Sequence, residues 1–185
     1  MGNLIQTMVG HNYSLVDDRC LSHDGCIVDL GCHSWDWSQF FINKKRVIGV
    51  DPYEKQINGT EIFNGLIYDY NGKVNFGNKG WASNIFDGGS DEFEVITWKK
   101  FCSLFNIDKI SILKMNIEGS EYGIIRSLDG DDFSKIDQIA VSFHDWLKHE
   151  WSKDTKECIE ILTKNGFTVS PIHLPLGWYL ATKNV

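Results

Sequence analysis

The chain has 185 residues, of which 42% are hydrophobic and 23% charged, and its 25 acidic against 18 basic residues give a net charge of -7. This balance excludes a disordered chain and fits one compact domain, and the negative charge disfavours nucleic acid as a partner. No apolar run approaches the roughly 20 residues that cross a bilayer, and the five cysteines form no C-x-x-C pair. We therefore expect a cytoplasmic protein with no membrane partner.

The first part of the chain predicts a brace followed by a strand-helix-strand unit. Residues 1–24 have loose helical spacing, so we expect a helical lid or brace ahead of a cofactor-binding domain over residues 25–185. Residues 26–30 form a continuous apolar run between two glycines, which is typical of a buried parallel strand. Residues 35–45 have helical spacing and end in basic residues, and residues 47–51 form a second strand.

The rest of the chain alternates extended and helical patterns. Asn71-Gly72 lies between two apolar runs and predicts a hairpin turn, and a polar stretch follows. The other predicted strands cover residues 62–67, 93–96, 110–115, 136–143, 167–172 and 178–181, and the helices cover 98–105, 121–128 and 155–164. This alternation predicts a single α/β domain with a mostly parallel sheet and one antiparallel strand in a C-terminal hairpin.

The carboxyl ends of the first two strands are the expected ligand site, because open parallel sheets bind ligands there. Asp29 and Gly31 end the first strand, and Asp51 and Pro52 end the second. A dinucleotide fold needs a G-x-G-x-x-G loop for the pyrophosphate, and this loop has one glycine. S-adenosylmethionine has no phosphate and needs one close backbone approach and an acid for its ribose, so Gly31 and Asp51 favour it over NAD. A structural turn without a ligand is the alternative explanation.

Several segments together carry a resemblance to a known family. They are residues 27–31 (IVDLG), 47–52 (VIGVDP), 64–67 (NGLI), 69–74 (DYNGKV) and 113–121 (LKMNIEGSE). In order and spacing they resemble the FkbM-type methyltransferases, whose most specific element is K-x-D-x-E-G-x-E, and the resemblance extends from about residue 25 to the C-terminus. It implies a class I (Rossmann-like) S-adenosylmethionine-dependent O-methyltransferase with seven strands in the order 3-2-1-4-5-7-6. The implied acceptor is a hydroxyl of a sugar, a glycan or another small molecule.

Two positions depart from the family pattern. Trp35 stands where the family has a second glycine, which changes the expected shape of the methionine pocket. Asn116 stands where the family has aspartate, and an amide holds a ligand but takes no proton near neutral pH. The residues expected to bind the cofactor are Asp29, Gly31, His33, Asp51, Pro52 and Asn116. A solvent-facing loop position explains His33 equally well.

The candidates for catalysis are Lys114, Asn116, Glu118 and His144. The first three alternate along the end of a strand and so share one face. A lysine in an apolar strand needs a partner, and we expect Glu118 or Glu121; a purely structural ion pair is the alternative to a catalytic role. His144 ends the next strand and is a candidate base, since imidazole titrates near neutrality. A divalent cation on Glu118 and His144 is also conceivable, but no ligand spacing supports it, and metal-free base catalysis is preferred.

The sequence does not identify the acceptor and leaves rival functions open. Trp81 and Trp146 are candidate contacts to a sugar ring, because aromatic faces stack on sugars. Asn116 and Trp35, with no sizeable acceptor domain in the chain, keep open a non-catalytic S-adenosylmethionine-binding or interaction domain. A nucleotide-dependent oxidoreductase is the third hypothesis, and the missing glycines count against it.

Overall fold

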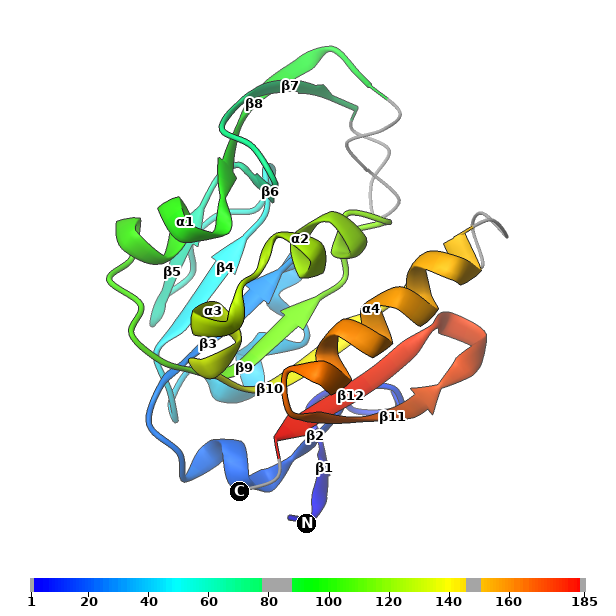
Figure 1. Cartoon of the computed structure of the whole chain (residues 1–185). Coiled ribbons are helices and arrows are strands. Elements are labelled where there is room, and N and C mark those ends of the chain that lie inside the picture. Colours follow the sequence, from blue (N-terminus) through cyan, green and yellow to red (C-terminus); the bar gives the residue numbers. More distant parts are fainter. Residues whose placement is uncertain (1, 78–87, 146–150, 184–185) are drawn as a thin grey trace.

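A computed structural model describes residues 2–77, 88–145 and 151–183. Its centre is a seven-stranded sheet in the order β11-β12-β10-β9-β3-β4-β5 (Figure 1). The strands are β3 (Cys26–Leu30), β4 (Val47–Val50), β5 (Thr60–Phe63), β9 (Ile110–Met115), β10 (Ile136–Ser142), β11 (Phe167–His173) and β12 (Trp178–Lys183). Numbered along the chain within this sheet, their order is 3-2-1-4-5-7-6, as the resemblance implies.

The sheet is mixed, so the prediction of a mostly parallel sheet is wrong. The pairs β3-β4, β4-β5, β3-β9 and β9-β10 are parallel, whereas β12 runs antiparallel to both of its neighbours, β10 and β11. The connection from β11 to β12 is a short 3-10 turn, Leu174–Leu176, followed by Gly177 at φ 61°. So short a connection reverses the chain, and β12 inserts as an antiparallel strand between β10 and β11.

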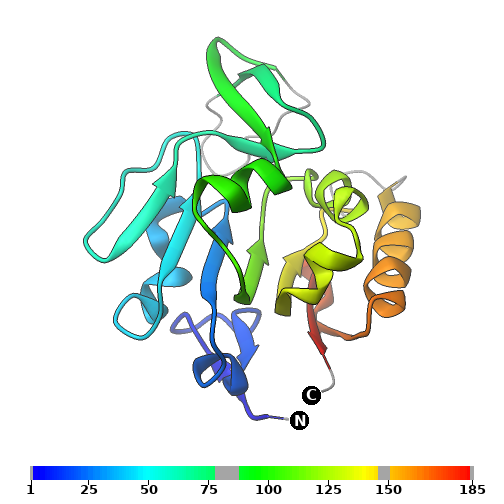
Figure 2. The ribbon, with the colours of Figure 1, turned by 60° about the vertical axis from the view of Figure 1, so that its left-hand side comes forward.

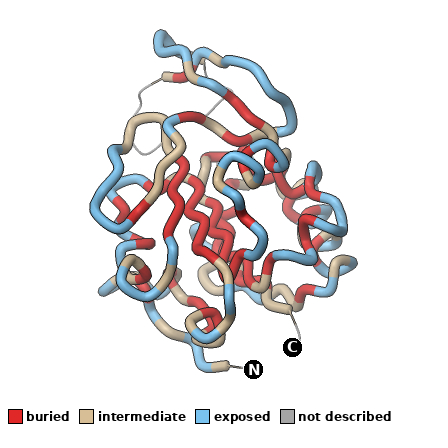
Figure 3. The backbone as a smooth tube through the Cα atoms, turned by 90° about the vertical axis from the view of Figure 1, so that its left-hand side faces the viewer, coloured by how far each residue is buried: buried red, intermediate tan, exposed pale blue. Residues whose placement is uncertain are grey.

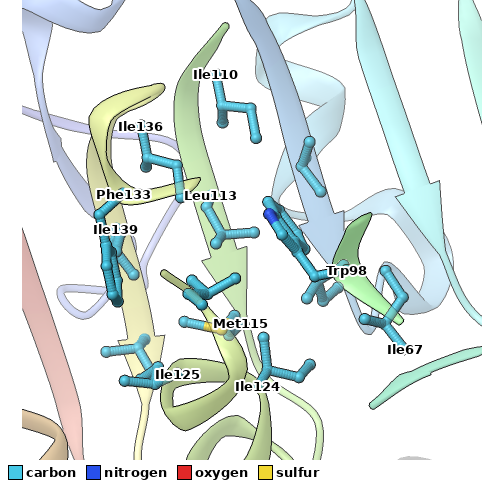
Figure 4. Close-up of a cluster of buried hydrophobic side chains, with 14 of the residues drawn as sticks. Ile67, Trp98, Ile110, Leu113, Met115, Ile124, Ile125, Phe133, Ile136 and Ile139 are labelled. Atoms are coloured by element: carbon cyan, nitrogen blue, oxygen red, sulfur yellow. The ribbon is translucent and has the colours of Figure 1, made fainter. Parts of the chain in front are cut away.

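Helices cover one face of the sheet and bury the larger core. They are α1 (Trp98–Leu104), α2 (Glu121–Ser127), α3 (Gly130–Ser134) and α4 (Ser152–Lys164). Figure 4 shows Leu113 and Met115 of β9 close to Ile124 and Ile125 of α2, within one cluster of buried side chains. The helices predicted over these segments are confirmed, except that the short α3 is not predicted. Because β3, β4 and β9 are buried along their whole length (Figure 3), their sequences are mostly apolar, with Asp29, Ser111 and Lys114 as the polar exceptions.

Turns cover much of the other face, where the sequence predicts one helix over residues 35–45. The structure has two separate 3-10 turns instead, His33–Trp35 and Ser38–Phe41. Ser34 and Trp35 both have φ 56°, a left-handed conformation that an α-helix of L-residues cannot contain. The aromatic side chains that suggest helical spacing, Trp37 and Phe41, still point into the core.

The N-terminal segment braces this second face, but as strands rather than the predicted helix. β1 (Leu4–Gln6) pairs antiparallel with β2 (Leu15–Asp17), and a 3-10 turn, Asp18–Leu21, follows. Val16 packs into the core of this face. Gln138 of β10 fastens the hairpin, since its amide accepts from the Asp17 N–H at 3.1 Å and donates to the Asp17 carbonyl at 2.9 Å. Tertiary anchoring therefore overrides the loose helical pattern of residues 1–24.

A three-stranded arm extends beyond one end of the sheet (Figure 2). Its strands are β6 (Leu66–Tyr68), β7 (Gly72–Phe76) and β8 (Asp91–Thr97), in the order β6-β8-β7. β8 lies between the other two, so the predicted hairpin across Asn71-Gly72 is wrong, and the strand predicted over residues 62–67 is divided between β5 and β6. Within the described residues, no helix is long and apolar enough to cross a membrane.

Candidate active site

A cavity of about 470 Å³ lies over the carboxyl ends of β3, β4 and β9. This size is typical of a small-molecule site. Its lining includes the predicted residues Gly31, His33, Asp51, Pro52, Lys114, Asn116 and Glu118. It also includes residues that the sequence did not single out, among them Tyr13 from the N-terminal hairpin, Tyr53 and Glu54 after β4, Phe76 from the arm and Trp178 from β12.

Gly31 makes the close approach that the sequence predicts, but to the protein itself. It has φ 76°, and a β-carbon on it would lie 2.2 Å from the carbonyl oxygen of Asn116. Asn116 in turn donates its N–H to the Leu30 carbonyl at 3.1 Å. A side chain at position 31 would therefore push apart the loops after β3 and β9, and its effect on a ligand could not be separated from its effect on the fold.

Lys114 is paired with Asp29, not with Glu118 or Glu121 as predicted. The parallel register sets Lys114 opposite Asp29, and Nζ lies 2.8 Å from Asp29 Oδ1. Nζ also donates to the carbonyls of Gly31 at 2.7 Å and Leu30 at 3.3 Å. Both side chains are buried. Lys114 thus holds the loop that contains Gly31 in place. The signal that could have identified Asp29 as the partner of Lys114 is the register of the two neighbouring strands.

Asp51 occupies the position expected for a ribose-binding acid. Its Oδ1 accepts hydrogen bonds from the N–H groups of Tyr53 at 2.9 Å and Glu54 at 3.1 Å, which fix the side chain. In the described part of the chain no group donates to Oδ2. Burial raises the pKa of the carboxyl above its usual value, although the two backbone donors act in the opposite direction. A hydroxyl donor from a ligand would find a half-buried, oriented acceptor here.

The side chain of Trp35 does not line the cavity, so this departure from the family pattern leaves the pocket open. It is buried against Gly49, where an added β-carbon would lie 2.5 Å from the ring, and its Nε1 donates to the Lys55 carbonyl at 2.9 Å. His33 lies at the cavity mouth, with its side chain 62% exposed and Nδ1 3.2 Å from Glu54 Oε1. Asn116 lines the cavity between the Gly31 loop and Glu118.

Glu118, His144 and Glu121 form a buried cluster beside the cavity. His144 Nε2 lies 3.2 Å from Glu118 Oε1, and Nδ1 lies 2.8 Å from Glu121 Oε1. Glu121 begins α2 and also accepts from the N–H groups of Ile117 at 2.7 Å and Gly119 at 2.8 Å. These bonds stabilise a turn in which Glu118 itself has φ 53°. The sequence suggested Glu121 as a partner of Lys114. The position of Glu121 at a helix N-terminus instead indicates a carboxylate that accepts hydrogen bonds from backbone N–H groups.

The two glutamates change the role predicted for His144. Burial alone would lower the His144 pKa, but the carboxylates of Glu121 and Glu118 outweigh it and raise the pKa to about 10. The imidazole is therefore protonated at neutral pH and cannot take a proton from an acceptor there. Glu118 lines the cavity, and its second oxygen, Oε2, is buried with no hydrogen-bond partner among the described residues. Glu118 thus replaces His144 as the candidate base.

The free energy of unfolding is expected to fall by about 2 kcal/mol between about pH 6.5 and pH 8.5. The folded protein keeps the His144 proton up to about pH 10, whereas an unfolded histidine loses it near pH 6.5. The contribution is complete below about pH 6.5, falls progressively as the pH rises above it, and is fully lost only above about pH 10. Urea denaturation at several pH values measures it, and His144→Gln should remove most of the slope. An equal slope in the variant would contradict the assignment.

The structure leaves the predicted sugar contacts untested and bears on the metal alternative. Trp81 and Trp146 lie outside the described residues. In the described ranges, no group of three or more histidine, cysteine, aspartate or glutamate side chains is arranged to hold a metal ion.

Comparison with known proteins agrees with the fold. The family model for the methyltransferase FkbM domain matches residues 10–169. The chain belongs to the FkbM methyltransferase family. No curated protein gives a significant match. The crystal structure of methyltransferase FkbM from Methylobacillus flagellatus KT is similar, with a TM-score of 0.55 and 16% identity over 93% of this chain. The match covers 48% of that protein, so this FkbM domain spans about half its length.

The motif that carries most of the resemblance to this family lies within the matched residues. Residues 113–121 run from the end of β9 into α2 and supply Lys114, Asn116, Glu118 and Glu121. Within the motif, Lys114 and Glu121 hold the backbone of two adjoining loops, whereas Asn116 and Glu118 line the cavity. The motif therefore divides into residues that build the site and residues positioned to contact a ligand.

Proposed function

We propose that this FkbM domain is an S-adenosylmethionine-dependent methyltransferase of class I, Rossmann-like fold, acting on a hydroxyl of a sugar, glycan or other small molecule. The observation that carries the proposal is the acidic cavity at the carboxyl ends of the strands. Its described lining has four acids, Asp36, Asp51, Glu54 and Glu118, against one lysine that is already paired. Such a lining favours a cationic ligand and disfavours a pyrophosphate.

The residues present fit S-adenosylmethionine. Asp51 offers an oriented carboxylate to the ribose hydroxyls, and the apolar side chains of Leu66, Ile67 and Phe76 offer a surface for the adenine. When bound, the cofactor supplies a methyl group on a positively charged sulfur, and S-adenosylhomocysteine is the product. The chain's own task is to align an acceptor hydroxyl and take up its proton as the carbon–oxygen bond forms. Glu118, held by protonated His144, is the carboxylate positioned to take it.

Asp51→Ala should weaken S-adenosylmethionine binding by about tenfold to a hundredfold, because it removes a charge-assisted hydrogen bond. Isothermal titration calorimetry measures this, with Asp108→Ala as the matched control, since Asp108 is an exposed acid at the opposite end of the sheet. NAD titrated into the wild type should give no binding. Unchanged affinity in a folded Asp51→Ala protein, or tighter binding of NAD than of S-adenosylmethionine, would contradict the proposal.

A second candidate is a domain of the same fold that binds S-adenosylmethionine without methyl transfer. Asn116 favours it, because an amide stands at the motif's aspartate position. Release of S-adenosylhomocysteine in the presence of a panel of hydroxyl compounds separates the two. Binding without release for any acceptor would favour the second candidate.

A further inference from the structure

The cavity extends well beyond the part assigned to the cofactor. Asp51 follows β4, and Trp178 begins β12. Four strand-to-strand spacings separate β4 from β12, which is roughly 19 Å at the usual distance between neighbouring strands. Trp178 pairs with Ser142 at the carboxyl end of β10, so it lies at the same edge of the sheet as the cofactor site. The far end of the cavity is lined by Met8, Tyr13 and Ser14 of the N-terminal hairpin together with Trp37 and Trp178. We call these five residues the hairpin wall.

The hairpin wall is aromatic and firmly held. The rings of Tyr13 and Trp178 are stacked, with centroids 5.6 Å apart and planes at 18°. Thr7 fixes the base of the loop, since its N–H and Oγ1 both donate to the Ser14 carbonyl, at 2.8 Å and 3.0 Å. Trp37 and Trp178 are each only 5% exposed, so the half-buried Tyr13 is the ring that presents area to the cavity, and a flat apolar face of a ligand stacks on such a preformed ring.

Two polar atoms of the hairpin wall have no hydrogen-bond partner among the described residues: the Ser14 hydroxyl and the Trp37 indole N–H. Both residues are buried, at 1% and 5% exposure. An unpaired buried polar group is costly, so partners from the occupant of the cavity would stabilise the wall. Lys114, the one lysine in the described lining, is engaged with Asp29, so the wall offers no unpaired lysine or arginine for a phosphate or carboxylate.

We infer that the hairpin wall is the acceptor subsite and that it takes a neutral sugar ring, whose apolar face stacks on the ring of Tyr13 while its hydroxyls pair with Ser14 and Trp37. This inference rests on the proposed function, because the acceptor must lie beside the cofactor. A purely apolar acceptor would leave both polar atoms unpaired, and an anionic one would meet the acidic lining. The N-terminal hairpin is then a specificity element as well as a brace.

Saturation-transfer NMR tests the inference on protein loaded with S-adenosylhomocysteine. The probes are methyl glycosides of glucose, galactose, mannose and rhamnose, with methyl glucuronide and octanol as anionic and apolar comparisons. At least one neutral glycoside should bind, more tightly than either comparison. Tyr13→Ala should weaken that binding at least tenfold, and Trp37→Phe, which keeps a ring but removes the N–H, should weaken it several-fold. Tyr70→Ala, an exposed tyrosine outside the cavity, should leave it unchanged.

The two proposals fail in different ways. If S-adenosylmethionine binds the wild type normally but no neutral glycoside does, or if Trp37→Phe and Tyr13→Ala both bind the glycoside as the wild type does, the acceptor subsite is overturned and the proposed function stands. If S-adenosylmethionine does not bind the wild type, the proposed function fails and the acceptor subsite fails with it. Thermal melts of each variant check folding, and Trp37→Phe provides the test if Tyr13→Ala does not fold.

Discussion

Glu118→Gln is expected to slow methyl transfer by about a hundredfold to ten-thousandfold while S-adenosylmethionine affinity stays within about threefold. The glutamine keeps the shape of the side chain but cannot take the proton of an acceptor hydroxyl. His144 is a poor substitute, because Glu121 remains in the variant and its carboxylate makes the largest contribution that raises the His144 pKa. Release of S-adenosylhomocysteine with excess acceptor measures the rate, and calorimetry measures the affinity.

Glu160→Gln is the matched control, because Glu160 is an exposed glutamate on α4. It should leave rate and affinity unchanged. A Glu118→Gln protein that turns over at the wild-type rate would show that alignment alone supplies the rate and that Glu118 is no base. A large loss of cofactor affinity in Glu118→Gln would instead assign Glu118 to cofactor binding.

Lys114→Met is expected to lower the free energy of unfolding by about 3 to 5 kcal/mol, because it leaves the buried Asp29 carboxylate without its partner. It also removes the hydrogen bond to the Gly31 carbonyl, so the glycine loop should loosen. The double variant Asp29→Val with Lys114→Met removes both charges and should recover most of the lost stability. Urea denaturation of the wild type, both single variants and the double variant measures the coupling.

Lys156→Met on the exposed side of α4 serves as the control for removing a lysine. It should change stability by less than about 0.5 kcal/mol. If Lys114→Met were as stable as the wild type, or the double variant no more stable than the Lys114→Met variant, the pair would not be the structural clamp assigned to it. Loss of turnover in a fully stable Lys114→Met protein would restore the catalytic role that the sequence suggested.

The sequence predicts the central strands well because both faces of these strands are buried. β3, β4 and β9 appear as mostly apolar runs, and Asp29, Asp51 and Lys114 at or near their ends stand out against those runs. The motif over residues 113–121 identified the family, and the family model confirms it over residues 10–169. The second face was predicted less well, because residues 35–45 and 1–24 are apolar at helical spacing but fold as 3-10 turns and strands. The packing of each side chain on the sheet, not local propensity, decides those segments.

By itself the sequence determined the family, the core strands and the edge of the sheet that carries the candidate site, since these depend on local patterns and on a short motif. The tertiary structure alone decided what each polar residue touches. Lys114 binds the Gly31 carbonyl across 83 residues of chain, His144 meets Glu118 and Glu121 from the next strand, and Tyr13 reaches Trp178 from the N-terminal hairpin. Partners so distant in the chain are set by strand register and packing. The charge of His144 depends on such neighbours, so it could not be predicted before the fold showed the two glutamates beside it.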